Sequence, residues 1–172
     1  MTGTTYNVPP IPPDEAHTTY VDAGPLRIGV EYRLLDQTEL SANYEGAEME
    51  EIQDALGGAV VEDNGASIHV LGRDDEHEYL RFDLFDVGPH YHYIDRGGES
   101  QTIVDYDRVA LGEMLPWTLA QLRNRIVPML ERAGGENVAR QVEADAESVR
   151  SSLGEVERLV KIAQDELASA KR

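Results

Sequence analysis

The chain contains 172 residues, and its 33 acidic and 15 basic residues give it a net charge of -18 at pH 7. So acidic a surface repels phosphate backbones and anionic lipid headgroups, which excludes nucleic acid and a membrane surface as expected partners. The sequence contains no cysteine, so disulfides, thiolate zinc sites and cysteine nucleophiles are excluded as well. No apolar run reaches the ~18 residues of a membrane span, and the N-terminus does not resemble a signal peptide. We therefore expect a cytoplasmic protein.

Residues 1–25 are predicted to form an extended arm. The five prolines of this segment prevent a regular helix and favour polyproline-type backbone. Apolar side chains, among them Tyr6, Val8 and Ile11, would allow such an arm to dock on a protein surface. The sequence thus predicts an arm without strands, which is either disordered or wrapped over a neighbouring molecule.

Residues 26–133 are predicted to form an α+β domain. Apolar and polar residues alternate over residues 26–35, which is typical of a half-buried strand. Residues 45–56 place their apolar side chains on one face of an acidic helix. Gly57, directly after this segment, is a residue that commonly ends helices, so we expect the helix to stop there.

Hairpins are predicted in the middle of this domain. The pair Asn64-Gly65 is typical of a tight turn and predicts a hairpin between the apolar segments on either side of it. Three further strands are expected at residues 78–86, 90–95 and 101–107, with glycine-containing turns between them. Connections this short join antiparallel strands, so the sequence favours a meander over a parallel sheet with crossover helices.

The C-terminal part of the chain is predicted to be helical. Residues 116–132 have an apolar stripe of helical period, and Pro128 within it should kink the helix. Over residues 136–170, apolar residues recur at spacings of three and four, which is the seam of a coiled coil held for about four heptads. A helix of that length extends roughly 50 Å, so its seam needs a partner. The expected oligomer interface consists of Val142, Val149, Leu153, Val156, Val160 and Leu167.

Together these elements predict an α+β fold with an antiparallel meander sheet of five or six strands, packed by helices and followed by a long coiled-coil helix. The three units expected along the chain are the arm over residues 1–25, the domain over 26–133 and the coiled-coil helix over 136–170. The coiled coil predicts either a homo-oligomer or a subunit of a larger protein complex.

Polar residues of the predicted hairpins gather on one face of the sheet, because alternate residues of a strand point to the same side. A turn centred on residues 87–88 would place Asp83 opposite His92, and the next turn would place Asp105 opposite His90. A shift of one residue would scatter the set, so the cluster depends on this register. The face is expected to contain His69, Arg81, Asp83, His90, His92 and Asp105.

This polar face predicts a metal or anionic-ligand site. His90 and His92 would point the same way, and a carboxylate from the next strand can join them as a ligand. Nitrogen and oxygen ligands suit Zn(II), Fe(II), Ni(II) or Mn(II), and Arg81 could hold the carboxylate of a substrate. The alternative is the solvent-facing side of a half-covered sheet, where such pairs only stabilise strand pairing. The candidate metal ligands are His69, Asp83, His90, His92 and Asp105.

Residues 82–93 have the sequence Phe-Asp-Leu-Phe-Asp-Val-Gly-Pro-His-Tyr-His-Tyr. This stretch resembles a bacterial family known only as a domain of unknown function. The resemblance extends over the predicted sheet and the first helix at most. It implies no activity, cofactor or site residue.

Three hypotheses of function remain in competition. The sequence favours a non-catalytic accessory or scaffold subunit that assembles through its coiled coil and its arm, since four heptads are a stronger indication than one His-x-His pair. The alternative is a metal-dependent or small-ligand enzyme or binding protein that uses the His/Asp/Arg face. A sensor domain whose dimeric helix transmits a change is a third reading of the same features.

Overall fold

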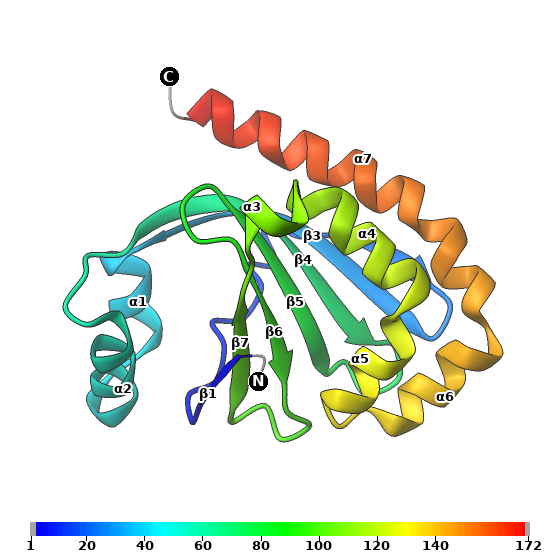
Figure 1. Ribbon diagram of the computed structural model, residues 1–172, viewed down its shortest axis with the longest axis horizontal. Helices are drawn as coiled ribbons and strands as arrows, with labels where there is room; N and C mark the ends of the chain where they lie inside the picture. The colour runs from blue at the N-terminus through cyan, green and yellow to red at the C-terminus, as the bar shows by residue number, and fades with distance from the viewer. Residues whose placement is uncertain (1–2, 171–172) are drawn as a thin grey trace.

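Seven strands form one antiparallel sheet in the computed structural model, which describes residues 3–170 (Figure 1). Their order across the sheet is β1-β7-β6-β5-β4-β3-β2, so β2 to β7 are neighbours in space as well as in sequence. The predicted α+β class and antiparallel sheet are confirmed, although the sheet has seven strands instead of five or six. The strands are β1 (Thr4–Tyr6), β2 (Thr19–Ala23), β3 (Leu26–Asp36), β4 (Glu62–Gly72), β5 (Glu78–Phe85), β6 (His90–Ile94) and β7 (Gln101–Asp105).

Helices lie on both sides of this sheet (Figure 1). The C-terminal helices cover its apolar face, and the two helices between β3 and β4 pack with the arm on the other side. The helices are α1 (Gln37–Asn43), α2 (Gly46–Leu56), α3 (Arg108–Leu111), α4 (Met114–Asn124), α5 (Ile126–Arg132), α6 (Glu136–Ala144) and α7 (Ala146–Ala170).

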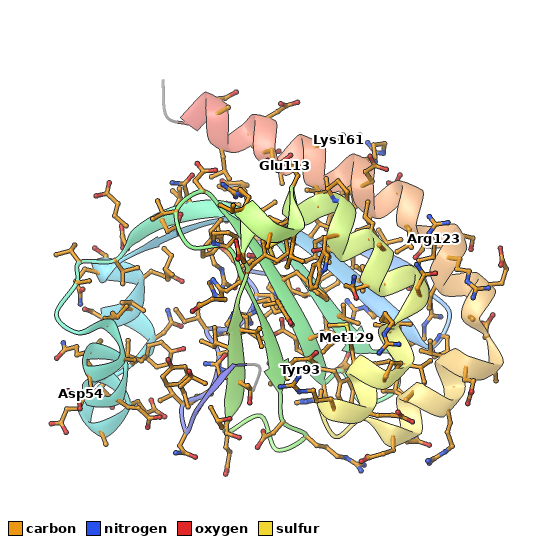
Figure 2. All side chains as sticks on the ribbon, in the orientation of Figure 1. Asp54, Tyr93, Glu113, Arg123, Met129 and Lys161 are labelled. Carbon is orange, nitrogen blue, oxygen red and sulfur yellow. The ribbon has the colours of Figure 1, made fainter. Side chains whose placement is uncertain are left out.

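The main core lies between the sheet and the C-terminal helices. Alternate residues of the central strands, including Ile28, Ile68 and Phe82, are fully excluded from solvent. The long helix α7 packs against β2, β3 and β4. Trp117 of α4 contacts Tyr91, with ring centroids 5.2 Å apart, and so anchors this helix to the sheet. Figure 2 shows how densely side chains fill the space between the two layers.

The predicted hairpin at Asn64-Gly65 is wrong, because β4 continues through both residues as one strand. Gly65 allows β4 and β5 to approach each other closely, since a Cβ atom at this position would overlap the carbonyl oxygen of Leu84 in β5. The connection between β3 and β4 instead consists of α1, α2 and the segment after them. Gly57 ends α2 in the left-handed conformation, as the sequence predicts.

The prediction of a strandless arm is wrong, because β1 and β2 lie within residues 1–25 and form the two edges of the sheet. The two-residue turn Gly24-Pro25 joins β2 to β3, and Gly24 supplies the positive φ of 65° that this turn needs. The proline-rich segment between β1 and β2 docks on the chain's own sheet instead of a neighbouring molecule. Val8 and Ile11 of this segment are buried beside α1.

The expected coiled-coil helix is broken at Asp145 into α6 and α7, where the Asp145 carboxylate accepts a hydrogen bond from the Ser148 hydroxyl (2.8 Å). The apolar seam packs within the same chain, because the sheet and α4 cover it, whereas Lys161 points outward (Figure 2). A helix with an apolar stripe of this period can pack against the apolar face of a sheet as well as against a second helix. Self-association stays an untested prediction. The apolar seam no longer supports it, because the seam is already covered within the chain. The seam residues, each at most 5% exposed, are Val142, Val149, Leu153, Val156, Val160 and Leu167.

The predicted helix over residues 116–132 is also divided, into α4 and α5. Pro128 has no amide hydrogen for the carbonyl four residues earlier, and its ring clashes with that carbonyl, which belongs to Asn124. The helix accordingly ends at Asn124 and a new one begins at Ile126. The break lets the chain turn along the sheet towards α6 (Figure 1).

Replacing Leu153 with alanine should lower the free energy of unfolding by about 2–5 kcal/mol, because the removed side chain leaves a cavity under α7. Ile162 lies on the same helix but is 40% exposed, so Ile162→Ala should change stability by about 0.5 kcal/mol or less. Urea denaturation measures both. If Leu153→Ala instead dissociates an oligomer in size-exclusion chromatography without loss of stability, the seam lies between molecules.

Candidate metal centre

The polar face of the sheet is buried, which excludes the alternative of a solvent-facing polar side. Arg81, Asp83 and His92 are 2%, 3% and 5% exposed. The arm covers them and offers its backbone carbonyls to the side chains beneath, as where Arg33 donates to the carbonyl oxygen of Pro12 (2.6 Å). A buried polar face needs such partners, because each unpaired polar group out of water costs free energy.

The pairing of β5 with β6 differs from the predicted register by two residues. Asp83 lies opposite His90, and Arg81 lies opposite His92. A shift of two residues, unlike a shift of one, leaves every side chain on its original face. The polar cluster therefore forms despite the error, and the predicted pairing of His90 with Asp105 is confirmed.

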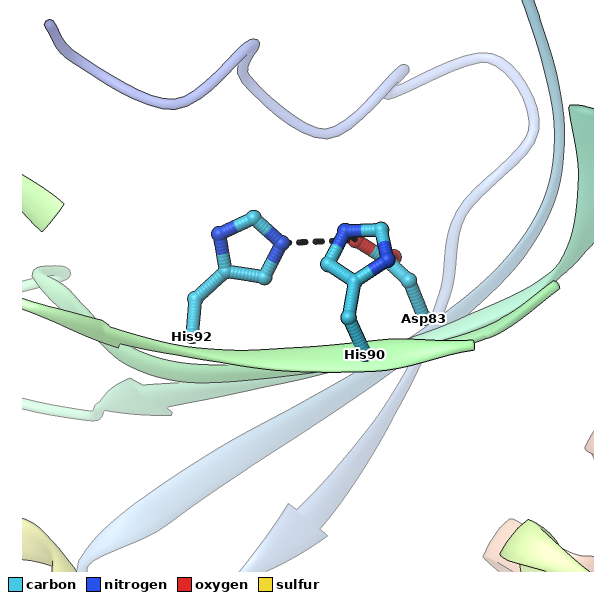
Figure 3. A group of neighbouring side chains, drawn as sticks. All are labelled: Asp83, His90 and His92. Carbon is cyan, nitrogen blue, oxygen red and sulfur yellow. Dashed lines mark hydrogen bonds and ion pairs between the residues drawn. The ribbon is translucent and has the colours of Figure 1, made fainter. Parts of the chain in front are cut away.

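Three of the predicted ligands converge: Asp83 from β5, and His90 and His92 from β6 (Figure 3). Their ligand atoms all lie within 4.8 Å of one another. Oδ2 of Asp83 is 2.9 Å from Nε2 of His92 and 3.3 Å from Nε2 of His90. Atoms that each lie about 2.0–2.2 Å from a shared ion are roughly 3–3.5 Å apart, so these distances suit ligands of one metal ion.

The second ring nitrogen of each histidine faces a hydrogen-bond acceptor. Nδ1 of His90 lies 2.7 Å from the carbonyl oxygen of Gly88. Nδ1 of His92 lies 2.7 Å from Oε1 of Gln101, whose Nε2 donates to the carbonyl oxygen of Val8 (3.1 Å). Because that carbonyl only accepts, the amide of Gln101 must turn its oxygen towards His92. Both histidines therefore carry a hydrogen on Nδ1 and leave Nε2 for the cluster.

In their neutral forms, both histidines aim an Nε2 lone pair at the same oxygen of Asp83. The other oxygen of Asp83 accepts a hydrogen bond from the Ser67 hydroxyl. One proton can bridge only one of the two nitrogen–oxygen contacts, and two protons would create imidazolium rings with centroids 4.8 Å apart. A divalent cation satisfies all three atoms at once, and the hydrogen bonds at Nδ1 are those that orient metal-binding histidines.

The protonation equilibria of the cluster are strongly perturbed. Burial opposes ionisation of Asp83, yet its hydrogen bonds and charge interactions with both histidines hold the pKa well below its usual value. Burial lowers the pKa of His90, but the Asp83 carboxylate outweighs burial and raises it. For His92, burial dominates and lowers the pKa. Asp83 and His92 are thus biased towards the ionised and neutral forms that bind metal, whereas His90 favours the imidazolium and would have to release a proton when a metal ion binds.

Two predicted ligands lie outside this cluster. Asp105 is exposed at the end of β7, although it pairs with His90 along the strands. His69 has Nε2 2.9 Å from Glu31 and Nδ1 2.6 Å from Glu78, so both of its nitrogens donate to carboxylates. His69 is therefore an imidazolium within a buried chain of charges, and it has no lone pair to offer a metal ion.

Arg81 belongs to the same chain of charges. Its Nε and Nη2 donate to the two carboxylate oxygens of Glu78 at 2.8 Å and 2.7 Å, a bidentate pair. Burial opposes the charge of Arg81, but Glu78 outweighs burial and raises the pKa of the guanidinium above its usual value. Arg81 also lines a cavity of about 170 Å³ between the polar face, the arm and α2, which His90 and His92 line as well.

The predicted polar face did not include Gln101 and Glu31. Both could have been predicted from the alternation of side chains along their strands. Gln101 shares its side of β7 with Asp105, and Glu31 lies on the polar side of β3. Glu78 could not have been found in this way. A bulge near Val70 shifts the pairing of β4 with β5, so that Glu78 joins the polar face out of step with the alternation.

A family described as a domain of unknown function matches residues 20–160. The chain belongs to this family, DUF7700. The match confirms the resemblance seen in the sequence, although it extends beyond the sheet and the first helix into α7, and it brings no activity with it. The DUF7700 range contains Asp83, His90 and His92, whereas the proline-rich segment of the arm lies before it. Neither curated proteins nor solved structures gave a match.

Within residues 3–170, no helix combines the length and the apolar character needed to cross a membrane.

The stability of this DUF7700 protein should depend on pH through His69. Burial lowers its pKa, but the charge of Glu78 and hydrogen bonds to Glu31 and Glu78 outweigh burial and raise it. The resulting stabilisation is complete below the unfolded value of ~6.5 and is lost as the pH rises through the folded pKa. His69→Gln should thus cost about 3–5 kcal/mol of unfolding free energy near pH 6, and less as the pH rises.

Urea denaturation at about pH 6 and about pH 9 measures this difference. His17→Gln is the matched control, because the His17 side chain is 47% exposed and its carboxylate partner, Asp14, is exposed as well. A penalty for His69→Gln that is equal at both pH values would contradict an imidazolium at this position.

Proposed function

We propose that this DUF7700 protein binds a divalent first-row metal ion through Asp83, His90 and His92, and that it uses the ion to bind and act on a small molecule in the adjoining cavity. One observation supports this most directly. Two imidazole Nε2 atoms, each with its opposite nitrogen already used as a donor, meet at one carboxylate oxygen.

The donor set narrows the choice of metal. Two imidazoles and one carboxylate suit Zn(II), Fe(II), Ni(II) or Mn(II), and they do not suit the all-oxygen preference of calcium or magnesium. Three protein ligands leave coordination positions free for water or substrate. This number is typical of catalytic zinc sites and of Fe(II) sites with two histidines and one carboxylate, whereas structural zinc sites have four protein ligands.

The free coordination positions would face the cavity, because His90 and His92 both line it. A metal ion there can polarise a carbonyl group or lower the pKa of a bound water molecule. This role is better supported than that of an accessory subunit, since the seam on which assembly depended packs against the chain's own sheet.

Protein stripped with EDTA should bind about one Zn(II) or Co(II) ion per chain, and the ion should raise the melting temperature. Affinity should fall as the pH drops through ~6.5, because a protonated imidazole cannot ligate. Isothermal titration calorimetry and elemental analysis measure uptake. His92→Ala removes a ligand and should abolish binding, whereas His17→Ala should not. Wild-type protein that takes up no stoichiometric metal would contradict the proposal.

Gln101→Leu should weaken metal binding about 10–100-fold while leaving all three ligands in place, because His92 loses the acceptor that orients its ring. The matched control is Gln121→Leu in α4, since the Gln121 amide donates to the backbone carbonyl of Trp117 on the other side of the sheet, away from the cluster. The same titrations with Zn(II) provide the measurement. Unchanged affinity in Gln101→Leu would show that the amide does not position His92.

A further inference from the structure

The cavity beside the cluster has one polar wall and one apolar wall. Arg81, His90, His92 and Gln101 from β5, β6 and β7 form the polar wall. Aliphatic side chains of the arm and α2 form the opposite wall, among them Val8, Ile11, Ile52 and Leu56. The exposed surface of this cavity is predominantly apolar. Such a space fits a molecule with an apolar body and a single polar group, which would point at the sheet.

The charges behind the polar wall favour an anionic group. Three carboxylates, of Glu31, Glu78 and Asp83, are balanced by three cations there. The cations are Arg33, Arg81 and the His69 imidazolium. A divalent metal ion at the cluster would add two positive charges without a matching carboxylate. Because the protein as a whole is strongly acidic, this local excess of positive charge would distinguish the cavity from the rest of its surface.

The size of the cavity limits the apolar body. Its volume of about 170 Å³ is close to that of a ~150 Å³ protein cavity that accepts benzene. The space inside the cavity therefore fits about six to nine non-hydrogen atoms, the size of a single ring or a short chain with one acidic group. Because the cavity is open to solvent, a nucleotide or a peptide of several residues would place most of its atoms outside it.

We propose that the cavity binds a small, largely apolar monocarboxylate, with its carboxylate next to His90 and His92 and its body against the arm and α2. This inference rests on the proposed metal centre, and it names the class of ligand that the centre serves. The apolar wall favours a ligand with an apolar body, and the carboxylate of the ligand offsets the charge of the metal ion. Dicarboxylates and sugars are disfavoured, because a second polar group would lie unpaired against aliphatic side chains.

Benzoate and its neutral analogue benzamide test the proposal, because they have the same shape and differ in charge. Zn(II)-loaded protein should bind benzoate roughly tenfold or more tightly than benzamide, since only benzoate makes charge-assisted contacts. In Co(II)-loaded protein, benzoate should also change the visible absorption of the metal, which reports coordination directly. Calorimetry and absorption titration give the two readouts.

Ile52→Trp provides the matched variant, because it fills the cavity from α2 without touching the cluster. It should keep full Zn(II) uptake and lose benzoate binding. Ala55→Trp, at an exposed residue of the same wall, serves as the second variant if Ile52→Trp does not fold. Val109→Trp, at a residue of α3 that is 99% exposed, is the control and should bind benzoate as the wild type does.

The outcomes separate this inference from the proposed function. Zn(II) uptake without benzoate binding, or with equal binding of benzamide, overturns the ligand class and leaves the metal centre intact. Benzoate binding that survives both tryptophan variants overturns the cavity as its site. Protein that takes up no metal refutes the proposed function, and it refutes the inference as well if benzoate does not bind.

Discussion

The constraint that organises the polar side of this structure is the burial of one ionised carboxylate, that of Asp83, between two imidazoles. A buried charge is tolerated only where partners surround it, and removal of a partner from such a pair costs about 3–5 kcal/mol. Ser67 satisfies one oxygen of Asp83, and His90 and His92 face the other. The sheet can hold this arrangement because its opposite face is packed against α4–α7, which keeps the strands and their register in place.

The proline-rich segment of the arm is suited to cover such a face. A segment outside the sheet offers carbonyl groups that no neighbouring strand uses, and side chains beneath it supply the donors. Arg33 and Tyr44 each donate to carbonyl oxygens of this segment, and Gln101 donates to that of Val8. Gln101 also holds the ring of His92, so the docking of the arm and the orientation of a proposed metal ligand depend on the same amide group.

The two faces of the sheet explain why the C-terminal helix does not need a second molecule. An amphipathic helix must cover its apolar stripe, and in this chain a sheet with an apolar face lies within reach. The charged and apolar sides of the strands are therefore closed by different parts of the chain. Helices α4–α7 cover the apolar side, and the arm with α1 and α2 covers the polar side. The cavity forms on the polar side, where the aliphatic residues of the cover meet polar residues of the sheet.

The sequence by itself determined the α+β class, the antiparallel strands and the grouping of Asp83, His90 and His92 on one face, because these follow from alternation and short turns. Their grouping survived a register error, since a shift of two residues preserves the face. Only the tertiary structure decided what covers each face. The period of apolar residues indicates which side chains will be buried, but it does not indicate which part of the protein will cover them. The heptad seam was therefore assigned to contact with a second molecule. Likewise, the tautomers of the histidines depend on Gln101 and Gly88, whose positions come from long-range packing that no local pattern encodes.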